Sequence, residues 1–245
     1  MILTTAIIKG GTGKSTTTAA IAQAAAIQGK KVLCVDMDPQ GNLTYILGGD
    51  TALRGSLELL NGQEVTPQQT ASGVDLYAAS VDLSAEVTRK GSVTRLSKAL
   101  EGIKRKYALI VIDTPPTLGE LTYNALYAAD EILIPMTQDA MCMHGAIYLA
   151  NIADQIRQSN GKAHIVGAIV NMYKTRGRMK NTAYNYIVEQ SKINRIPLLG
   201  NVREAAALQE AQSLHENLYS YAPKCNPALD YMKIYERIAK RRAKK

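Results

Sequence analysis

A glycine-rich stretch near the amino terminus has the residue types that bind phosphate groups. It runs from Ile7 to Thr16 as IIKGGTGKST and contains the triplet Gly13-Lys14-Ser15. Glycine lets backbone N–H groups approach phosphate oxygens, lysine neutralises the β- and γ-phosphates, and a serine hydroxyl binds Mg²⁺. An apolar run precedes the stretch and an alanine-rich helical pattern follows it, which favours a loop that opens a helix at the phosphates. The stretch therefore predicts a site for a nucleoside triphosphate and Mg²⁺.

The first half of this loop departs from the common phosphate-loop template. The template G-x-x-x-x-G-K-S/T expects glycine where Ile8 stands, and Lys9 supplies a second cation five residues before Lys14. We expect Thr16 to donate to the α-phosphate. The residues expected to surround the phosphates are Gly10, Gly11, Thr12, Gly13, Lys14, Ser15 and Thr16. The chemistry of one phosphate loop leaves open what the additional lysine binds.

Carboxylates follow two other apolar runs. The run LIVID ends at Asp113, and the run VLCVD ends at Asp36, with Asp38 two residues later. The carboxyl ends of parallel strands share one edge of a sheet, so these groups are expected beside the glycine-rich loop. We expect Asp113 to hold Mg²⁺ through water, and Asp38 to orient a water molecule in line with the γ-phosphate and to reach the metal. Asp36 either stabilises the end of its strand or belongs to the shell of the metal.

Apolar β-rich runs alternate with helical patterns along the chain, which is typical of parallel βαβ units. Runs such as ALIVID and EILIP lack polar alternation, as expected for strands buried on both faces. The expected strands are 2–8, 31–36, 74–79, 109–113, 131–135, 164–170 and 197–199, and the expected helices are 14–27, 93–106, 120–128, 145–157, 181–192 and 227–240. The prediction is an α/β fold with a doubly wound, mostly parallel sheet flanked by helices. It forms a single domain over residues 1–245, with 48–73 as a helical excursion beside the sheet.

The acidic and glycine-rich stretches together resemble the ParA/MinD family of P-loop ATPases, which has the deviant loop K-G-G-x-G-K-S/T. The stretches are KGGTGKST from Lys9, DMDPQGN from Asp36 and DTPP from Asp113, and the later segments GAIVNMYKTRGR and NVREAAALQEA are similar too. The resemblance implies the P-loop NTPase fold. It also implies ATP and Mg²⁺ as ligands and a weak intrinsic ATPase activity that a partner stimulates.

The resemblance implies a role for the additional lysine. In the family this residue reaches the partner's nucleotide in an ATP-bound, face-to-face homodimer, so Lys9 is expected to complete the partner's site as an arginine finger does. Lys9, Lys14 and Asp38 are then the expected catalytic residues. Asp38 belongs to the first nucleotide-sensing switch, and the segment that begins at Asp113 belongs to the second.

The expected ligands of the metal and of the adenine complete the predicted site. The resemblance places Asn171 and the loop 197–203 near the adenine. The match in this loop is partial, because the family often has P-R-N-V-R where this chain has LGNVR. The expected metal ligands are Ser15, Asp38 and Asp113, and the residues expected near the adenine are Asn171, Asn201 and Val202.

The charge is distributed unevenly along the chain. The net charge is +8, but residues 1–150 have 12 Lys and Arg against 14 Asp and Glu, whereas residues 151–245 have 17 against 7. A basic half attracts polyanions such as nucleic acid or an anionic membrane, although it can also serve only as a solvated face. The three cysteines are scattered and have no metal-ligand spacing, and the amino terminus has no signal-peptide pattern, so we expect a cytoplasmic protein.

Three classes of ParA/MinD protein compete. One class performs metabolic or metal-carrier chemistry and includes iron-protein and synthetase relatives. A bridging iron–sulfur cluster needs cysteines near the dimer axis, whereas Cys34 is expected inside a strand and Cys142 is isolated. MinD-like membrane targeting needs a terminal amphipathic helix, but the apolar stripe of 227–240 is better explained by docking on the core. We therefore expect no stable membrane insertion. A nucleoid-riding positioner of a protein cargo stays open as an alternative.

DNA partition fits the basic half of the chain. By resemblance to short ParA/Soj-type proteins, which lack a helix-turn-helix extension, Arg176 and Arg203 correspond to arginines that bind DNA without sequence preference, with Arg178 and Lys180 beside the first. Such contacts go to phosphates and do not read bases. The partners implied are a second copy of the chain, double-stranded DNA and a ParB-like adaptor that triggers hydrolysis and release. The expected location is the cytoplasm, associated with the nucleoid.

Overall fold

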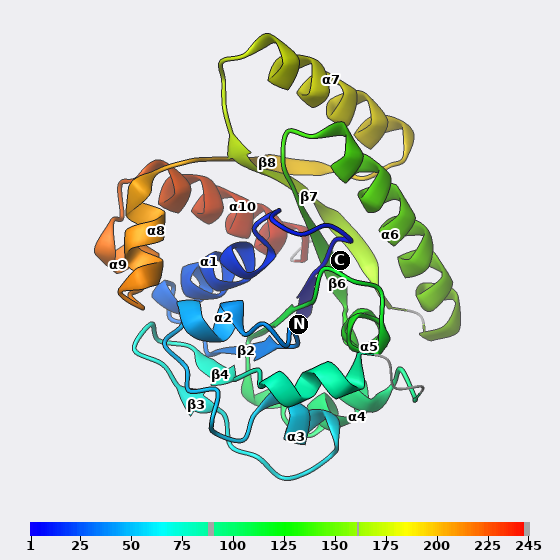
Figure 1. Ribbon diagram of the computed structural model, residues 1–245, viewed down its shortest axis with the longest axis vertical. Coiled ribbons are helices and arrows are strands. Elements are labelled where there is room, and N and C mark those ends of the chain that lie inside the picture. Colours follow the sequence, from blue (N-terminus) through cyan, green and yellow to red (C-terminus); the bar gives the residue numbers. More distant parts are fainter. Residues whose placement is uncertain (88–90, 161, 243–245) are drawn as a thin grey trace.

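The structure is a computed structural model that describes residues 1–87, 91–160 and 162–242. Its centre is an eight-stranded sheet with the strand order β3-β4-β2-β5-β1-β6-β7-β8 (Figure 1). All neighbouring strands pair in parallel except β3 and β4. The strands are β1 (Ile2–Thr5), β2 (Val32–Asp36), β3 (Gln68–Gln69), β4 (Asp75–Tyr77), β5 (Leu109–Asp113), β6 (Glu131–Met136), β7 (His164–Tyr173) and β8 (Leu198–Arg203).

Helices cover both faces of the sheet (Figure 1). On one face, α1 and α10 lie against the sheet with α2 and α9 beside them, and on the other face a row from α3 to α7 covers it. The helices are α1 (Lys14–Ile27), α2 (Asn42–Ile46), α3 (Ser56–Leu60), η1 (Val81–Glu86), α4 (Arg95–Glu101), η2 (Lys104–Lys106), α5 (Glu120–Ala128), α6 (Ala140–Asn160), α7 (Arg178–Ile193), α8 (Ala206–Ser213), α9 (Leu218–Tyr221) and α10 (Asn226–Arg242). The predicted doubly wound α/β fold is confirmed.

The central strands are buried along their whole length. Strands β1, β2 and β5 have only buried residues, and β5 pairs with both neighbours so that Asp113 lies level with Thr5 and Asp36. Apolar residues on both sides of these strands are what two helical layers require. The register places the glycine-rich loop and both acidic strand ends at one edge of the sheet.

Several predicted boundaries are wrong. The strand predicted over 2–8 ends at Thr5, because residues 6–13 leave the sheet to form the phosphate loop. The strand predicted over 197–199 continues to Arg203, where it pairs with β7. The helix predicted over 93–106 is divided into α4 and η2. Region 48–73 has only the short helix α3 and the edge strand β3, and α2, α8 and α9 were not predicted.

Helix α10 packs as a core helix. Tyr231, Ile234 and Ile238 are each 1% exposed and form the buried stripe of this helix, whereas the apolar side chain of Leu229 is 43% exposed. The stripe faces α1 and β8. Within the described part of the chain, no helix combines the length and apolar character needed to cross a bilayer.

Candidate functional site

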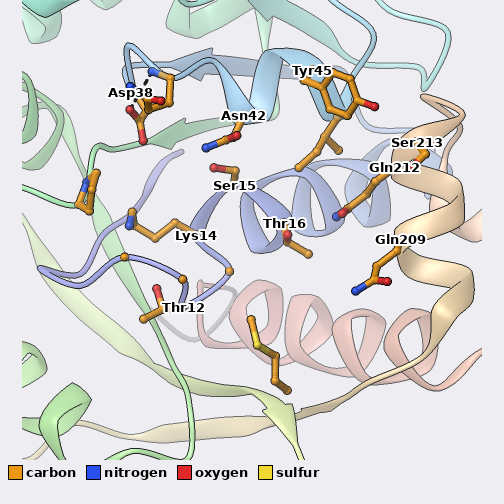
Figure 2. A pocket seen from close by; sticks show the side chains of 17 residues that line it. Thr12, Lys14, Ser15, Thr16, Asp38, Asn42, Tyr45, Gln209, Gln212 and Ser213 are labelled. Carbon is orange, nitrogen blue, oxygen red and sulfur yellow. Dashed lines mark hydrogen bonds between the residues drawn. The ribbon is translucent and has the colours of Figure 1, made fainter.

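The phosphate loop lies between β1 and α1 and forms one wall of a cavity of about 570 Å³. Gly11 and Gly13 have φ values of 70° and 79°, a left-handed conformation that glycine adopts at little cost. Figure 2 shows Lys14, Ser15 and Thr16 on this wall, Asp38 and Asn42 above them, and α8 on the far side. The lining residues are Gly10, Gly11, Thr12, Gly13, Lys14, Ser15, Thr16, Asp38, Gln40, Asn42, Tyr45, Ile46, Pro116, Met172, Gln209, Gln212 and Ser213. All seven residues predicted to surround the phosphates line this cavity.

The side-chain amide of Asn171 on β7 forms hydrogen bonds that hold the phosphate loop in place. Its Nδ2 donates to the carbonyl oxygen of Thr12 at 2.8 Å and to Thr17 Oγ1 at 3.0 Å, while its Oδ1 accepts from Tyr231 Oη at 3.0 Å. A Cβ added to Gly13 would lie 2.8 Å from Nδ2. The contact of Asn171 with the adenine stays a prediction, whereas the structure shows that its amide joins the loop to β7 and α10.

A buried carboxylate joins the loop helix to β5. Asp113 accepts from Ser15 Oγ at 2.5 Å and from Thr18 Oγ1 at 3.2 Å. Burial, the largest cause, raises the pKa of Asp113 above its usual range, as does the nearby Asp36, while the hydrogen bond from Ser15 opposes the shift. A neighbouring cation would favour the ionised form of this carboxyl group.

The donor set fits Mg²⁺. This ion prefers oxygen ligands and uses one or two carboxylates together with substrate phosphates and water. Ser15 would supply a hydroxyl oxygen, and Asp113 and Asp38 would supply carboxylates near it. Among the described residues no three His, Cys, Asp or Glu side chains converge as a protein-only metal site. Mg²⁺ bound here would neutralise phosphate charge, and the protein would orient it through these oxygens.

The two aspartates after β2 have different surroundings. Asp36 is fully buried and accepts from the backbone N–H and the hydroxyl of Thr44 at 2.8 and 2.7 Å, and from the Asp38 N–H at 3.1 Å. Asp38 instead lines the cavity and accepts from the Gln40 N–H at 3.0 Å. Of the two roles considered for Asp36, the geometry favours stabilising the strand end and α2. Asp38 is left free to act on a ligand in the cavity.

Lys14 is buried among groups of opposite charge. Its Nζ donates to the Lys9 carbonyl oxygen at 3.1 Å. Burial lowers the pKa of Lys14, whereas Asp113 and Asp38 act to raise it. Phosphate groups in the cavity would add negative charge beside Nζ and favour its ionised form.

Lys9 is paired within its own chain. Its ammonium group contacts Asp139 Oδ2, and Asp139 Oδ1 accepts from the Met141 N–H at 2.9 Å at the start of α6. The hydrogen bond to Asp139 raises the pKa of Lys9, and the same contact lowers the pKa of Asp139. Both side chains are partly exposed, at 33% and 44%, so the pair can open towards solvent.

A second cavity of about 160 Å³ adjoins the first and lies between β8 and α8. Val202, Asn171, Leu208 and Gln209 line it, which suits a flat base with a few polar contacts. Asn201 is not among its lining residues, because its side chain donates to Tyr184 Oη at 2.9 Å on the α7 side. Of the three residues predicted near the adenine, Asn171 and Val202 line this cavity.

The cations predicted to bind DNA fall into two groups. Arg176, Arg178 and Lys180 are exposed on the segment after β7. Arg203 is held by α10, because its Nε and Nη2 donate to the carboxylate of Asp230, both at 2.8 Å, and its backbone N–H donates to the same carboxylate at 3.1 Å. Arg203 can therefore bind a phosphate only in competition with Asp230.

Several lining residues had no signal in the sequence. Gln209 and Gln212 come from the unpredicted helix α8, and Met172 and Tyr45 belong to no motif that indicates ligand binding. Tyr231 lies far along the chain in α10, so its contact with Asn171 depends on tertiary packing.

Replacing Asn171 with alanine should weaken both the fold and nucleotide binding. The change removes the amide that bonds the Thr12 carbonyl and the Tyr231 hydroxyl and leaves the Tyr231 hydroxyl only its contact with Thr17 Oγ1 at 3.3 Å, which costs about 1–3 kcal/mol of unfolding free energy. Urea denaturation would measure that loss, and calorimetric titration with ATP should give a dissociation constant at least about tenfold higher. Asn151→Ala on the exposed face of α6 is the control. Wild-type values for Asn171→Ala would show that the amide does not support the loop.

Comparisons with known proteins agree with this geometry. The family model of an AAA domain matches residues 1–165. The chromosome partitioning protein ParA of Caulobacter vibrioides strain NA1000 is 31% identical, over 98% of this chain and 94% of that protein. The chromosome-partitioning ATPase Soj of Thermus thermophilus is 33% identical, over 95% of this chain and 93% of that protein.

Solved structures share the fold over nearly the whole chain. Cobyrinic acid a,c-diamide synthase from Mycobacterium smegmatis, with bound ADP and magnesium, has a TM-score of 0.83 and 26% identity over 99% of this chain and 95% of that one. MinD from Pyrococcus horikoshii, complexed with Mg-ADP, has a TM-score of 0.81 and 24% identity over 98% and 96% of the two chains. The full-length similarity and the two-lysine loop together identify this chain as a member of the ParA/MinD family of P-loop ATPases.

Proposed function

We propose that this chain is a DNA partition ATPase whose ATP-bound homodimer binds DNA without sequence preference. A ParB-like adaptor bound to DNA would stimulate its weak intrinsic hydrolysis and so release it, which segregates a plasmid or chromosome. The main support for this proposal is one segment that runs from the nucleotide cavities to the exposed cations. Asn171 and Met172 line the nucleotide cavities, and the exposed cations Arg176, Arg178 and Lys180 follow directly. A change at the nucleotide can thus move the DNA-binding residues.

A hydrogen-bonded link supports this coupling. The side chain of Gln138 bonds the backbone of Lys174 twice, accepting from its N–H at 2.7 Å and donating to its carbonyl at 3.0 Å. The next residue along is Asp139, the partner of Lys9. Release of Lys9 would therefore act on the loop that begins the basic segment.

The chemical roles follow from the positions in the cavity. Lys14 binds the β- and γ-phosphates, and Ser15 and Asp113 hold Mg²⁺. Asp38 orients the attacking water and reaches the metal ion. Val202 and Asn171 contact the adenine.

The surface around the phosphates suits a second copy of the chain. Large apolar side chains are exposed near the carboxyl ends of the strands, with Tyr45 at 58%, Met141 at 66% and Met172 at 40%. Exposed apolar side chains gathered in one region favour a protein interface. A face-to-face dimer would bury this region and bring Lys9 of each chain to the nucleotide of the other.

The family's membrane function finds less support in this chain. A membrane-binding helix presents bulky apolar residues to the bilayer, but α10 uses Tyr231, Ile234 and Ile238 to pack on the core. A protein cargo carried on DNA would use the same ATPase cycle and the same basic segment. The DNA experiment below separates membrane binding from both.

Asp38→Ala should stop turnover while leaving the ATP-bound dimer intact. Loss of a group that orients the attacking water typically lowers a rate by about 10²- to 10⁴-fold. Phosphate release would measure hydrolysis, and analytical ultracentrifugation with ATP would measure the dimer. Glu64→Ala, an exposed carboxylate outside the cavity, is the control. Normal turnover in Asp38→Ala would remove this residue from the mechanism.

Lys9→Ala should abolish ATP-dependent dimerisation, whereas Asp139→Asn should strengthen it. Lys9 must leave Asp139 to reach the partner, and an exposed ion pair contributes about 0.2–1 kcal/mol. Two pairs open per dimer, so Asp139→Asn should lower the dimer dissociation constant by between about two- and thirtyfold. Sedimentation with a non-hydrolysable ATP analogue would measure both variants.

The two variants test different statements. Asparagine keeps the acceptor for the Met141 N–H, so Asp139→Asn changes the charge and leaves the start of α6 in place. Asp154→Asn, which breaks the exposed pair with Arg157, is the matched control. An intact dimer in Lys9→Ala would refute the contact across the dimer. An unchanged constant in Asp139→Asn alone would show only that Asp139 does not compete for Lys9.

Arg176→Glu combined with Arg178→Glu should weaken binding to random duplex DNA in the ATP state. The slope of log affinity against log salt is negative, and each lost phosphate contact reduces its magnitude by about 1, so we expect a magnitude smaller by about 2 per protomer. Retention on immobilised duplex across a salt series would measure the slope. The wild type should bind with ATP and not with ADP.

The control reverses Lys224 and Lys233, two exposed lysines away from the basic segment, and makes the same change in net charge. Equal losses in both double variants would mean that net charge alone attracts the DNA. Equal binding with ATP and ADP would overturn the proposed cycle. ATP-dependent binding to anionic vesicles in preference to duplex would favour the MinD-like function.

A further inference from the structure

A cavity of about 460 Å³ lies at the amino ends of β1 and β5 and shares no lining residue with the two cavities beside the phosphate loop. Its floor is apolar and comes from Leu3, Ile21, Leu109, Tyr235 and Ile238, each of which is at most 7% exposed. Near its mouth lie the exposed small residues Ala108 and Ala239. The floor belongs to the main core, so the cavity has a shape that the fold itself maintains.

The rim of this cavity is basic. Lys30, Lys104 and Arg105 line it, and none of the lining residues that the structure describes is acidic. Lys104 has an exposed pair with Glu101 at 3.5 Å, whereas Lys30 and Arg105 form no ion pair within residues 1–87, 91–160 and 162–242. These three cations come from the α1–β2 turn and from η2. We name the cavity and these three cations the basic pocket.

More cations adjoin the basic pocket. Lys31, Lys106 and Lys240 are exposed and each follows a lining residue directly in sequence. The nearby carboxylate of Asp75 lies 4.0 Å from Lys31 Nζ and accepts a hydrogen bond from Tyr107 Oη, so it offsets one of these charges. The excess of positive charge around an apolar hollow remains.

We propose that the basic pocket binds an acidic peptide segment of a partner protein, with one bulky apolar side chain of the peptide in the hollow. Glutamates or aspartates on either side of that side chain would pair with Lys30 on one segment and with Lys104 and Arg105 on the other. The apolar side chain supplies affinity by leaving water, and the carboxylates supply orientation. This interaction goes beyond the proposed function, because it uses neither the nucleotide nor the DNA-binding segment.

Two other polyanions match the pocket less well. DNA phosphates would pair with the rim but would leave the apolar hollow unfilled. A membrane surface binds side chains that project into it, whereas the large apolar residues of this pocket are buried and recessed. An extended peptide is the polyanion that also has an apolar group to insert.

Fluorescence anisotropy with a labelled peptide tests the proposal on the full chain. The probe has a central leucine between two runs of three glutamates, and its variants carry alanine for the leucine or lysine for the glutamates. We expect saturable binding of the leucine peptide, an affinity about tenfold or more lower for the alanine peptide, and no binding of the lysine peptide.

Protein variants then locate the site. Lys104→Glu with Arg105→Glu should weaken binding by about tenfold, since two attractions become repulsions. Ala239→Trp should weaken it similarly without any change of charge, because the new side chain enters the mouth of the pocket. The control is Lys224→Glu with Lys233→Glu. Thermal unfolding and basal ATP hydrolysis should stay at wild-type values in every variant.

Three outcomes would overturn the proposal. The first is no saturable binding of the leucine peptide. The second is binding that survives both the charge reversal and Ala239→Trp. The third is displacement of the peptide by random duplex DNA or by phosphatidylglycerol vesicles, where the binding of that competitor to the protein also depends on Lys104 and Arg105. This result would assign the surface to nucleic acid or to a membrane.

Discussion

The nucleotide site depends on one buried amide. Asn171 donates to the loop at Thr12 and to α1 at Thr17, and it accepts from Tyr231 on α10. Three regions that are distant in sequence thus meet at one side chain: the loop with the start of α1, strand β7 and helix α10. The amide occupies the space that a Cβ at residue 13 would need, so glycine at this position lets the loop pack directly against β7. A buried polar group satisfied in this way favours one arrangement strongly, since any shift would leave its donors and acceptors unpaired.

The nucleotide site also depends on the balance of charged side chains around the phosphate loop. Asp36, Asp38 and Asp113 lie near one another, and burial raises the pKa of each. Lys14 is the buried cation among them, and Lys9 is turned outward to Asp139. A site with this excess of carboxylates gains stability from Mg²⁺, while phosphates gain it from the lysines. Metal and nucleotide are therefore expected to bind together.

The parts of the site that could be predicted are those that local sequence determines. The phosphate loop, Lys14, Ser15 and the strand end at Asp113 each have a short pattern with a mechanical reason. The pairing of Lys9 with Asp139 could not be predicted, because it depends on where the β6–α6 turn lies. The Arg203–Asp230 fork and the two α8 glutamines likewise arise from packing between distant helices. The mostly parallel sheet between two helical layers followed from the βαβ pattern, whereas the order of the strands and the ends of the elements depended on contacts that sequence does not contain.

Helix α1 and the turn after it contribute to two different surfaces. Its first residue, Lys14, lies in the nucleotide cavity, and Ile21 and the turn residue Lys30 line the basic pocket at the opposite edge of the sheet. Strand β1 connects the same two places, since Leu3 lies in the pocket floor and the phosphate loop follows Thr5. A rigid helix and strand that are packed in one core can transmit a displacement with little loss. A partner on the basic pocket would thus act on the same two elements that hold the phosphates, without contacting the nucleotide.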